Sequence, residues 1–225
     1  MARKIKTEKT KKKHALLIAF IVIIVLALLG VGIFFGWKYF KKGKGPGNPV
    51  EVKILDSIDE YGYQVSDKDS KYFKSEFDEL KKILLAKPVD EEKYATQVAK
   101  LFVIDLYTMD TKINKYDIGG NEFIHADKKE MFEQKVIDSL YSSMLDNTYG
   151  DRKQNLPEVK EVKVVSTEKT KYKLGKESVD AYLVKLEITY VKSYDYDTQA
   201  SIVLVKENDI KWSIVNTQPT LNPKF

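Results

Sequence analysis

Cysteine is absent from this 225-residue chain, and histidine occurs at only two positions. The first absence excludes disulfides, thiolate nucleophiles and cysteine-ligated zinc. His14 stands at the start of a long apolar run, so His125 is the histidine left for acid–base chemistry in the remainder. No Gly-x-Ser-x-Gly motif surrounds a serine. We therefore expect a protein that is not an enzyme.

Motifs for metals and cofactors are lacking too. Asp67-Lys-Asp-Ser-Lys resembles the start of a calcium loop, but the sixth-position glycine and the final glutamate are out of register. Gly119-Gly120 has no following Lys-Ser/Thr, as a phosphate-binding loop would require. We interpret this pair as a tight turn, with a hinge beside a pocket as the alternative. We expect no cofactor and no metal site.

Charge is distributed unevenly along the chain, whose formal net charge is +5. Residues 1–44 hold 11 basic residues and one acid, whereas the remainder holds 27 basic and 32 acidic residues, a net charge of −5. A nucleic-acid-binding domain normally carries its own basic surface. The acidic balance of the larger part therefore argues against DNA or RNA as a partner.

Residues 15–36 form an uncharged apolar run of 22 residues. As a helix this run would be roughly 33 Å long, which matches the hydrocarbon core of a bilayer. Aromatic residues typical of a membrane interface follow it, so we predict a transmembrane helix over residues 15–40. A cleaved signal peptide is the alternative, but its apolar core is shorter and ends at a small-x-small site.

Basic residues flank the predicted span, seven before it and four after it. The positive-inside rule then makes residues 1–14 a cytoplasmic basic tail. Residues 41–49, rich in glycine, proline and lysine, read as a flexible linker. We expect a single-pass protein of the cell membrane whose domain, residues 50–225, is extracytoplasmic.

The domain begins with a short strand or hairpin at 50–65 and a helical part at 66–147. Residues 50–55 alternate apolar and polar, and residues 61–65 are a candidate partner strand. Ser66 or Asp67 is the expected N-cap of a first helix that stops before Lys87-Pro88. Asp90-Glu91-Glu92 opens a second helix, which is apolar on nearly every side around residues 101–107 and should be central. Asp127 with Glu130 reads as the capping box of a third helix ending near Asp146.

Strand-like sequence fills residues 157–219. We expect four segments, at about 158–167, 178–193, 199–207 and 210–217, with residues 171–176 as turn material and Asn208-Asp209 at a hairpin tip. Helices followed by a meander of antiparallel strands predict an α+β fold, with about three helices on a curved sheet of about four long strands.

This order of anchor, linker, helices and long strands resembles the NTF2-like (cystatin-cone) fold over about residues 68–219. Among anchored proteins it is similar to bitopic scaffold components of type IV secretion and conjugation systems. The resemblance implies protein–protein contacts without catalysis, and a cone that often leaves a cavity between helices and sheet. Near such a cavity, we expect Tyr107, His125 and Tyr141.

Tyrosine is abundant, at 14 residues, and Tyr190, Tyr194 and Tyr196 alternate with acids near the end of one strand. These rings suit a sugar, a cationic peptide or a protein interface, although a strand ending in a polar turn explains them as well. We predict a scaffold or interaction domain of a cell-envelope complex, with other envelope proteins as partners and a homo-oligomer possible. The alternative is a membrane-anchored module that binds a small ligand or a glycan.

Overall fold

The computed structural model describes residues 48–193 and 195–218, and the chain divides into two units, Met1–Asn48 and Pro49–Phe225. The description below concerns the second unit. Across the described residues, no helix is both long enough and apolar enough to cross a membrane. The transmembrane helix predicted at residues 15–40 lies outside them.

Four antiparallel strands form the main sheet in the order β3-β4-β5-β6. They are β3 (Val159–Leu174), β4 (Glu177–Tyr190), β5 (Gln199–Glu207) and β6 (Lys211–Gln218). Asn208 and Asp209 have φ values of 53° and 61°, which suits the tight hairpin turn that joins β5 to β6. The predicted α+β class and four-stranded antiparallel meander are confirmed.

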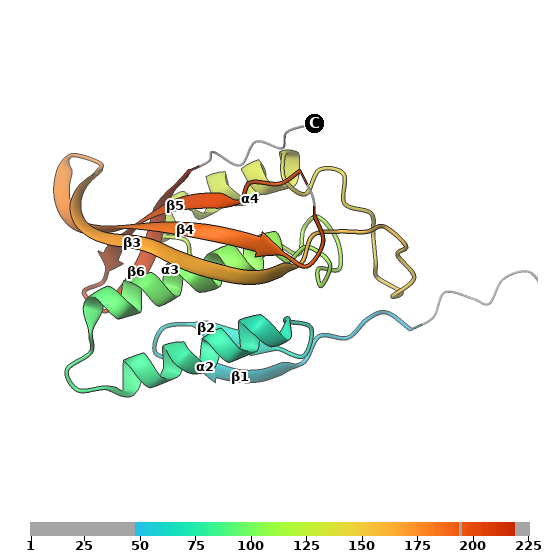
Figure 1. Cartoon of the computed structure of the whole chain (residues 1–225), viewed down its shortest axis with the longest axis horizontal. Coiled ribbons are helices and arrows are strands. Elements are labelled where there is room, and N and C mark those ends of the chain that lie inside the picture. The colour runs from blue at the N-terminus through green and yellow to red at the C-terminus, as the bar shows by residue number, and fades with distance from the viewer. Residues whose placement is uncertain (1–47, 194, 219–225) are drawn as a thin grey trace, which may run out of the picture. The chain divides into compact units, whose positions relative to one another are not determined.

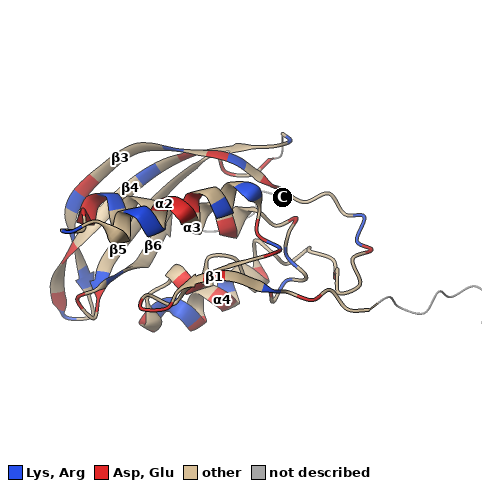
Figure 2. Ribbon diagram, turned by 90° about the horizontal axis from the view of Figure 1, so that it is seen from below, with Lys and Arg blue, Asp and Glu red and all other residues tan. Residues whose placement is uncertain are grey.

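The inner face of the sheet carries the alternating apolar residues of β4. Tyr182, Val184, Leu186, Ile188 and Tyr190 are all buried, as are Ile202 and Leu204 of β5. The opposite face of β3 is largely exposed and carries charges of both signs (Figure 2), whereas a small second apolar cluster of Ala181, Val205 and Val215 lies on that side of β4, β5 and β6. Lysines along β3 also protect that edge of the sheet against pairing with other chains.

Helix α3 (Glu91–Tyr107) is the centre of the core. Asp90 caps it, accepting a hydrogen bond from the Lys93 backbone N–H at 3.1 Å. Eleven of its 17 residues are buried, and it contacts all four strands of the sheet. In Figure 1 it lies between the sheet and α2 (Lys71–Leu85). The prediction of a central second helix is confirmed.

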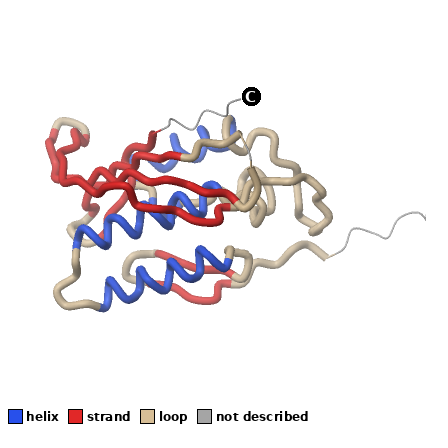
Figure 3. Tube along the Cα trace, in the orientation of Figure 1, coloured by secondary structure: helices blue, strands red, loops and turns tan. Residues whose placement is uncertain are grey.

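A small hairpin of β1 (Ile54–Ile58) and β2 (Tyr63–Ser66) covers the side of α3 away from the sheet, together with α2. The Tyr63 side chain is fully buried, and its hydroxyl lies 3.0 Å from the Tyr94 hydroxyl of α3. On the other side of the hairpin, Lys81 of α2 pairs with Asp56 of β1 at 2.5 Å. Figure 3 shows the two strands running beside α2.

Two short 3-10 turns, η1 (Asn121–Phe123) and η2 (Ala126–Lys128), lead into α4 (Lys129–Asp138). The predicted Asp127–Glu130 capping box is wrong, because the N-cap of α4 is Lys128 and makes no side-chain cap bond. The predicted end near Asp146 is wrong as well. The Ser139 hydroxyl donates to the Lys135 carbonyl at 2.5 Å, a local bond that competes with continuation of the helix.

Three other predicted boundaries differ from the structure. Strand β1 begins at Ile54 rather than Val50, because the Val50 N–H bonds to the Thr148 carbonyl at 2.7 Å instead of to a strand. The N-cap of α2 is Ser70, whose hydroxyl accepts from Phe73 N–H. Residues 171–174 belong to β3 and pair with 177–180, so the turn is confined to residues 175 and 176.

Candidate functional site

A groove between α4 and β6 is the candidate site. On α4 and the residue before it, Lys128, Met131, Phe132 and Lys135 recur at helical spacing and share the face that turns toward β6. Strand β6 supplies Ile214, Val215, Asn216 and Thr217, and Ile124 closes the floor. We call this set the α4–β6 groove, which encloses about 130 Å³.

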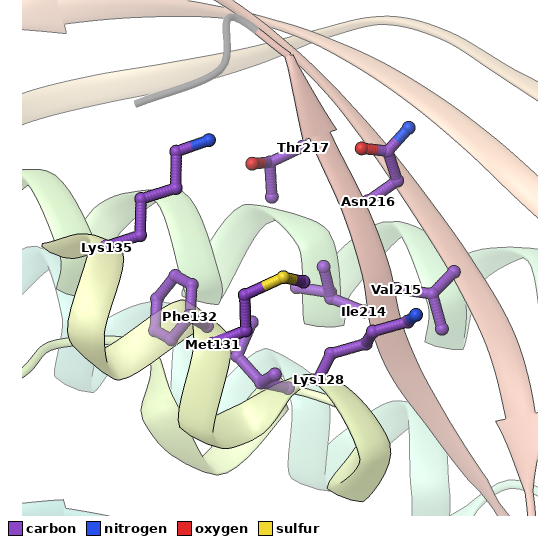
Figure 4. Close-up of a pocket in the computed structure, with 9 residues that line it drawn as sticks. Lys128, Met131, Phe132, Lys135, Ile214, Val215, Asn216 and Thr217 are labelled. Atoms are coloured by element: carbon purple, nitrogen blue, oxygen red, sulfur yellow. The ribbon is translucent and has the colours of Figure 1, made fainter. Parts of the chain in front are cut away.

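The groove combines an apolar floor with basic ends. Ile124, Phe132 and Ile214 form the floor and are at most 8% exposed, whereas Met131 is 66% exposed. Figure 4 shows the Met131 side chain reaching from α4 toward Ile214, with Lys135 near Thr217 at one end and Lys128 near Val215 at the other. An exposed thioether beside buried apolar groups is an adaptable contact surface.

An adjoining face of α4 has different chemistry. Asp127, Glu130, Gln134 and Asp138 line a shallow depression there, which shares Met131 and Lys135 with the groove. Carboxylates therefore lie next to the groove on one side of Met131 and Lys135. A segment lying in the α4–β6 groove would meet positive charge at both ends.

Strand β6 is an edge of the described four-stranded sheet. Its outer side is covered at Ile214, whose carbonyl accepts from the His125 N–H at 2.9 Å and which forms a parallel bridge with Ile124. Beyond Lys211, residues 212–218 carry no charge, in contrast to the lysine-rich β3 edge. An uncharged edge strand is the kind that accepts another chain.

A buried charge cluster lies where the chain leaves α3. Lys112 pairs with Asp105 of α3, and the two side chains are 8% and 16% exposed. Burial alone would lower the pKa of Lys112, but the Asp105 carboxylate raises it overall. Asp105 also accepts from the Gly120 N–H at 2.6 Å. A Cβ on Gly119 would stand 2.2 Å from the Asp105 carbonyl, so this turn requires glycine.

Glu122 extends this cluster toward β2 and β6. Burial, reinforced by the negative charge of Asp105, raises its pKa to about 8. One carboxyl oxygen accepts from Gln64 N–H at 3.2 Å, and among the described residues no hydrogen-bond partner faces the other, Oε1. Lys211 donates to the Glu122 backbone carbonyl at 2.9 Å. At neutral pH this carboxyl is therefore mostly protonated.

The residues predicted to line a cavity are engaged in structural contacts. The His125 side chain, 7% exposed, accepts from the Asp127 N–H through Nδ1 at 3.2 Å and so caps η2. The hydroxyl of fully buried Tyr141 donates to the Leu106 carbonyl at 2.7 Å and accepts from Gly119 N–H at 3.4 Å. A ligand pocket at these residues stays a prediction.

The structure brings three of the predicted tyrosines together. Tyr190 donates to the Asp197 carbonyl at 2.9 Å and its ring lies 6.2 Å from that of Tyr196. Burial, and then the nearby Tyr107, raises the pKa of the Tyr190 phenol. Tyr107 and Tyr190 are 4% and 8% exposed, so they are mainly packing residues. Tyr194 lies outside the described residues.

Sequence reasoning missed Lys128, Met131, Lys135 and the β6 residues of the groove. A signal was present: Met131 stands directly before the buried Phe132 with charged residues on both sides of the pair. Two consecutive apolar residues indicate that the apolar face of this helix extends beyond the part that packs against the sheet. The partner strand could not be named, because the pairing of α4 with β6 is a long-range contact.

In residues 48–193 and 195–218, no group of three or more histidine, cysteine, aspartate or glutamate side chains could hold a metal ion.

Comparison with models of known protein families, with curated proteins and with solved structures found no match. The functional argument therefore rests on the geometry of the chain itself.

Proposed function

We propose that this chain is a membrane-anchored, non-catalytic interaction domain that joins an assembly of the cell envelope from the extracytoplasmic side. The observation that carries the proposal is the α4–β6 groove, an apolar channel with a lysine at each end beside an uncharged edge strand.

The occupant we propose for the groove is a segment of a partner protein with an apolar anchor and acidic flanks. The floor residues and Met131 suit an apolar side chain, and Lys128 and Lys135 suit carboxylates. Partner residues outside the anchor could add hydrogen bonds along β6. The volume, about 130 Å³, fits one or two side chains and falls below the roughly 300 Å³ of small-molecule pockets.

The membrane part of the proposal comes from the apolar run at residues 15–36 and its basic flanks. Three helices followed by a four-stranded antiparallel sheet are the element order on which the resemblance to the NTF2-like cone rests. That resemblance is the reason for naming conjugation or secretion machines as candidate assemblies. The contacts that engage His125 as a cap add support for a role without catalysis.

A module that binds a small ligand or a glycan is the second candidate. A cleft of about 720 Å³ lies under the β3–β4 hairpin, and Tyr182 and Trp212 are among its lining residues. Their rings make an edge-to-face contact at 4.9 Å, and Lys169, Lys171, Glu91 and Asp180 supply hydrogen-bonding groups. Both rings are only 5% exposed, which leaves little aromatic surface for a sugar to stack on.

Site-specific photo-crosslinking in intact producing cells tests the leading proposal. A photoreactive amino acid replaces Met131 in the full chain, and the matched control replaces Val165 on β3, which is 58% exposed. We expect one discrete adduct from position 131, lost in the Lys128→Glu/Lys135→Glu background. An adduct at twice the chain mass would identify a second copy as the partner. Equal labelling from 131 and 165 contradicts the groove as an interface.

A further inference from the structure

Exposed apolar side chains gather at the end of the domain where the described chain begins. Val50 donates to the Thr148 carbonyl at 2.7 Å, which ties the start of the domain to the loop between α4 and β3. In that loop Leu145 is 61% and Tyr149 is 45% exposed. Val52, two residues after this contact, is 48% exposed.

A second loop meets the same end. The Asn147 N–H bonds to the Ile113 carbonyl at 2.7 Å, and Arg152 donates to the Lys112 and Asp110 carbonyls at 2.9 and 2.7 Å. These bonds hold the loop after α3, with Tyr116 68% exposed, against the 145–152 loop. Figure 1 shows these loops together on the side where the chain enters the domain.

We define the loop end by its four exposed apolar residues, Val52, Tyr116, Leu145 and Tyr149. Soluble proteins expose single apolar residues routinely, so exposure alone carries no conclusion. What distinguishes this set is its place. Residues 41–48 separate it from the predicted span at residues 15–40. A stretch of eight residues reaches about 28 Å at most.

From this position and chemistry we propose that the loop end of the domain rests on the lipid bilayer, with Tyr116 and Tyr149 at the level of the headgroups. This inference depends on the proposed membrane anchor. Tyrosine prefers the membrane–water interface, where its ring is shielded and its hydroxyl stays hydrated. Leu145 and Val52 add exposed apolar area at the same end of the domain.

Charge at the loop end predicts which lipids matter. Lys53, Lys115, Arg152 and Lys153 lie there with Glu51, Asp110, Asp117, Asp146 and Asp151, four basic residues against five acidic ones, so the two signs nearly balance. Lys115 also lies over the Tyr116 ring, 5.2 Å from its centre. With the signs balanced, contact depends on the apolar and aromatic groups rather than on anionic headgroups. The tether keeps the local lipid concentration high, so each group can contribute weakly and still hold the domain down.

The absence of cysteine makes a direct test possible. Tyr149→Cys in the full chain is labelled with an environment-sensitive fluorophore, and the protein is reconstituted into phosphatidylcholine vesicles with or without lipid-borne quenchers. Leu85→Cys is the matched control. Leu85 is 77% exposed and ends α2, next to the start of α3, so it lies at the opposite end of the domain from the loop that follows α3.

We expect strong quenching at position 149, little at position 85, and the same result after an anionic phospholipid is added. Leu145→Glu should reduce quenching at position 149 several-fold, whereas Val165→Glu, at a residue of β3 that is 58% exposed, should leave it unchanged. Equal quenching at 149 and 85, or none at 149, overturns the inference.

Flotation of the same samples separates this inference from the anchor. Protein that floats with the vesicles but is not quenched at position 149 keeps the anchor and loses the loop-end contact. Protein that fails to float with the vesicles would contradict the proposed membrane anchor, and with it the proposed function.

Discussion

Helices α3 and α4 belong to one domain and use their apolar residues in opposite ways. Eleven of 17 residues of α3 are buried, whereas only Phe132 and Val136 are buried in the ten residues of α4. Helix α3 contacts every strand of the sheet, while α4 lies beside the edge strand β6 and leaves a groove. The lesson is that the same kind of helix serves as core in one place and as an incomplete contact in the other.

Helices α3 and α4 contact each other through the rings of Phe102 and Phe132. Replacing either residue tests this contact, and the larger of the two losses of stability is the largest effect we predict. Phe102 of α3 is fully buried and its ring lies 5.7 Å from that of Phe132, which is 8% exposed. Phe102→Ala should lower the free energy of unfolding by about 4 kcal/mol, because the packed surroundings cannot collapse into the cavity. Phe132→Ala should cost about half as much, since the groove beside it is already open.

Urea denaturation of the detergent-solubilised full chain, followed by near-ultraviolet circular dichroism, measures both variants. Equal losses would mean that α4 is as firmly packed as α3, and the groove would then be part of the core.

A buried ion pair at the end of α3 gives the second test of how tightly this helix is packed. Lys112→Met should destabilise the fold by about 3 kcal/mol, because it leaves the Asp105 carboxylate buried with little besides the Gly120 N–H to compensate it. The double variant Lys112→Met/Asp105→Asn should recover most of the loss, since an amide oxygen still accepts from Gly120. Denaturation midpoints of the two variants check this, and additive losses would contradict a coupled pair.

These contrasts also explain what the sequence could predict. The stripe of Tyr94, Val98, Leu101, Phe102 and Leu106 predicts a central α3 because periodicity reports burial directly, and all five residues are buried. Residues 171–176 are predicted as turn material, although the structure keeps 171–174 in β3. Pairing of Lys171 with Asp180 across the hairpin keeps that segment in a strand.

The site was harder to predict than the fold, for a physical reason. Burial depends on periodic local sequence, but the groove depends on which strand lies beside α4. His125 shows the same limit, since its cap bond to Asp127 N–H is local while its backbone bond to Ile214 is long-range. Glu122 has no special sequence context, and its raised pKa comes from three segments folding around it.

Glu122 lies between α3 and α4, and its titration makes the stability of the domain depend on pH. Its pKa is about 8 in the folded chain against 4.5 for an ordinary glutamate, so unfolding releases a proton between these values. The free energy of unfolding should therefore fall by on the order of 1 kcal/mol per pH unit as pH rises from about 4.5 to 8. Above about pH 8 it should level off.

Glu122→Gln removes the charge that must be buried at high pH and keeps an oxygen for Gln64 N–H. We expect the variant to match the parent chain near pH 4.5 and to exceed its melting temperature by several degrees at pH 8.5. Thermal melts at the two pH values measure this. A shift that is the same at both would show that the carboxyl is not titrating in the folded protein.

The smallest predicted effect belongs to the exposed residue of α4. Met131→Ser should change the free energy of unfolding by less than about 0.5 kcal/mol, because a side chain that is 66% exposed loses little packing when it is shortened. The same change should weaken crosslinking from a photoreactive group at position 217, on the β6 side of the groove, since Met131 is the main apolar contact offered to a partner. Denaturation and crosslinking in the same preparation separate the two outcomes. A loss of stability near that of Phe132→Ala would place Met131 in the core, and α4 would then resemble α3 after all.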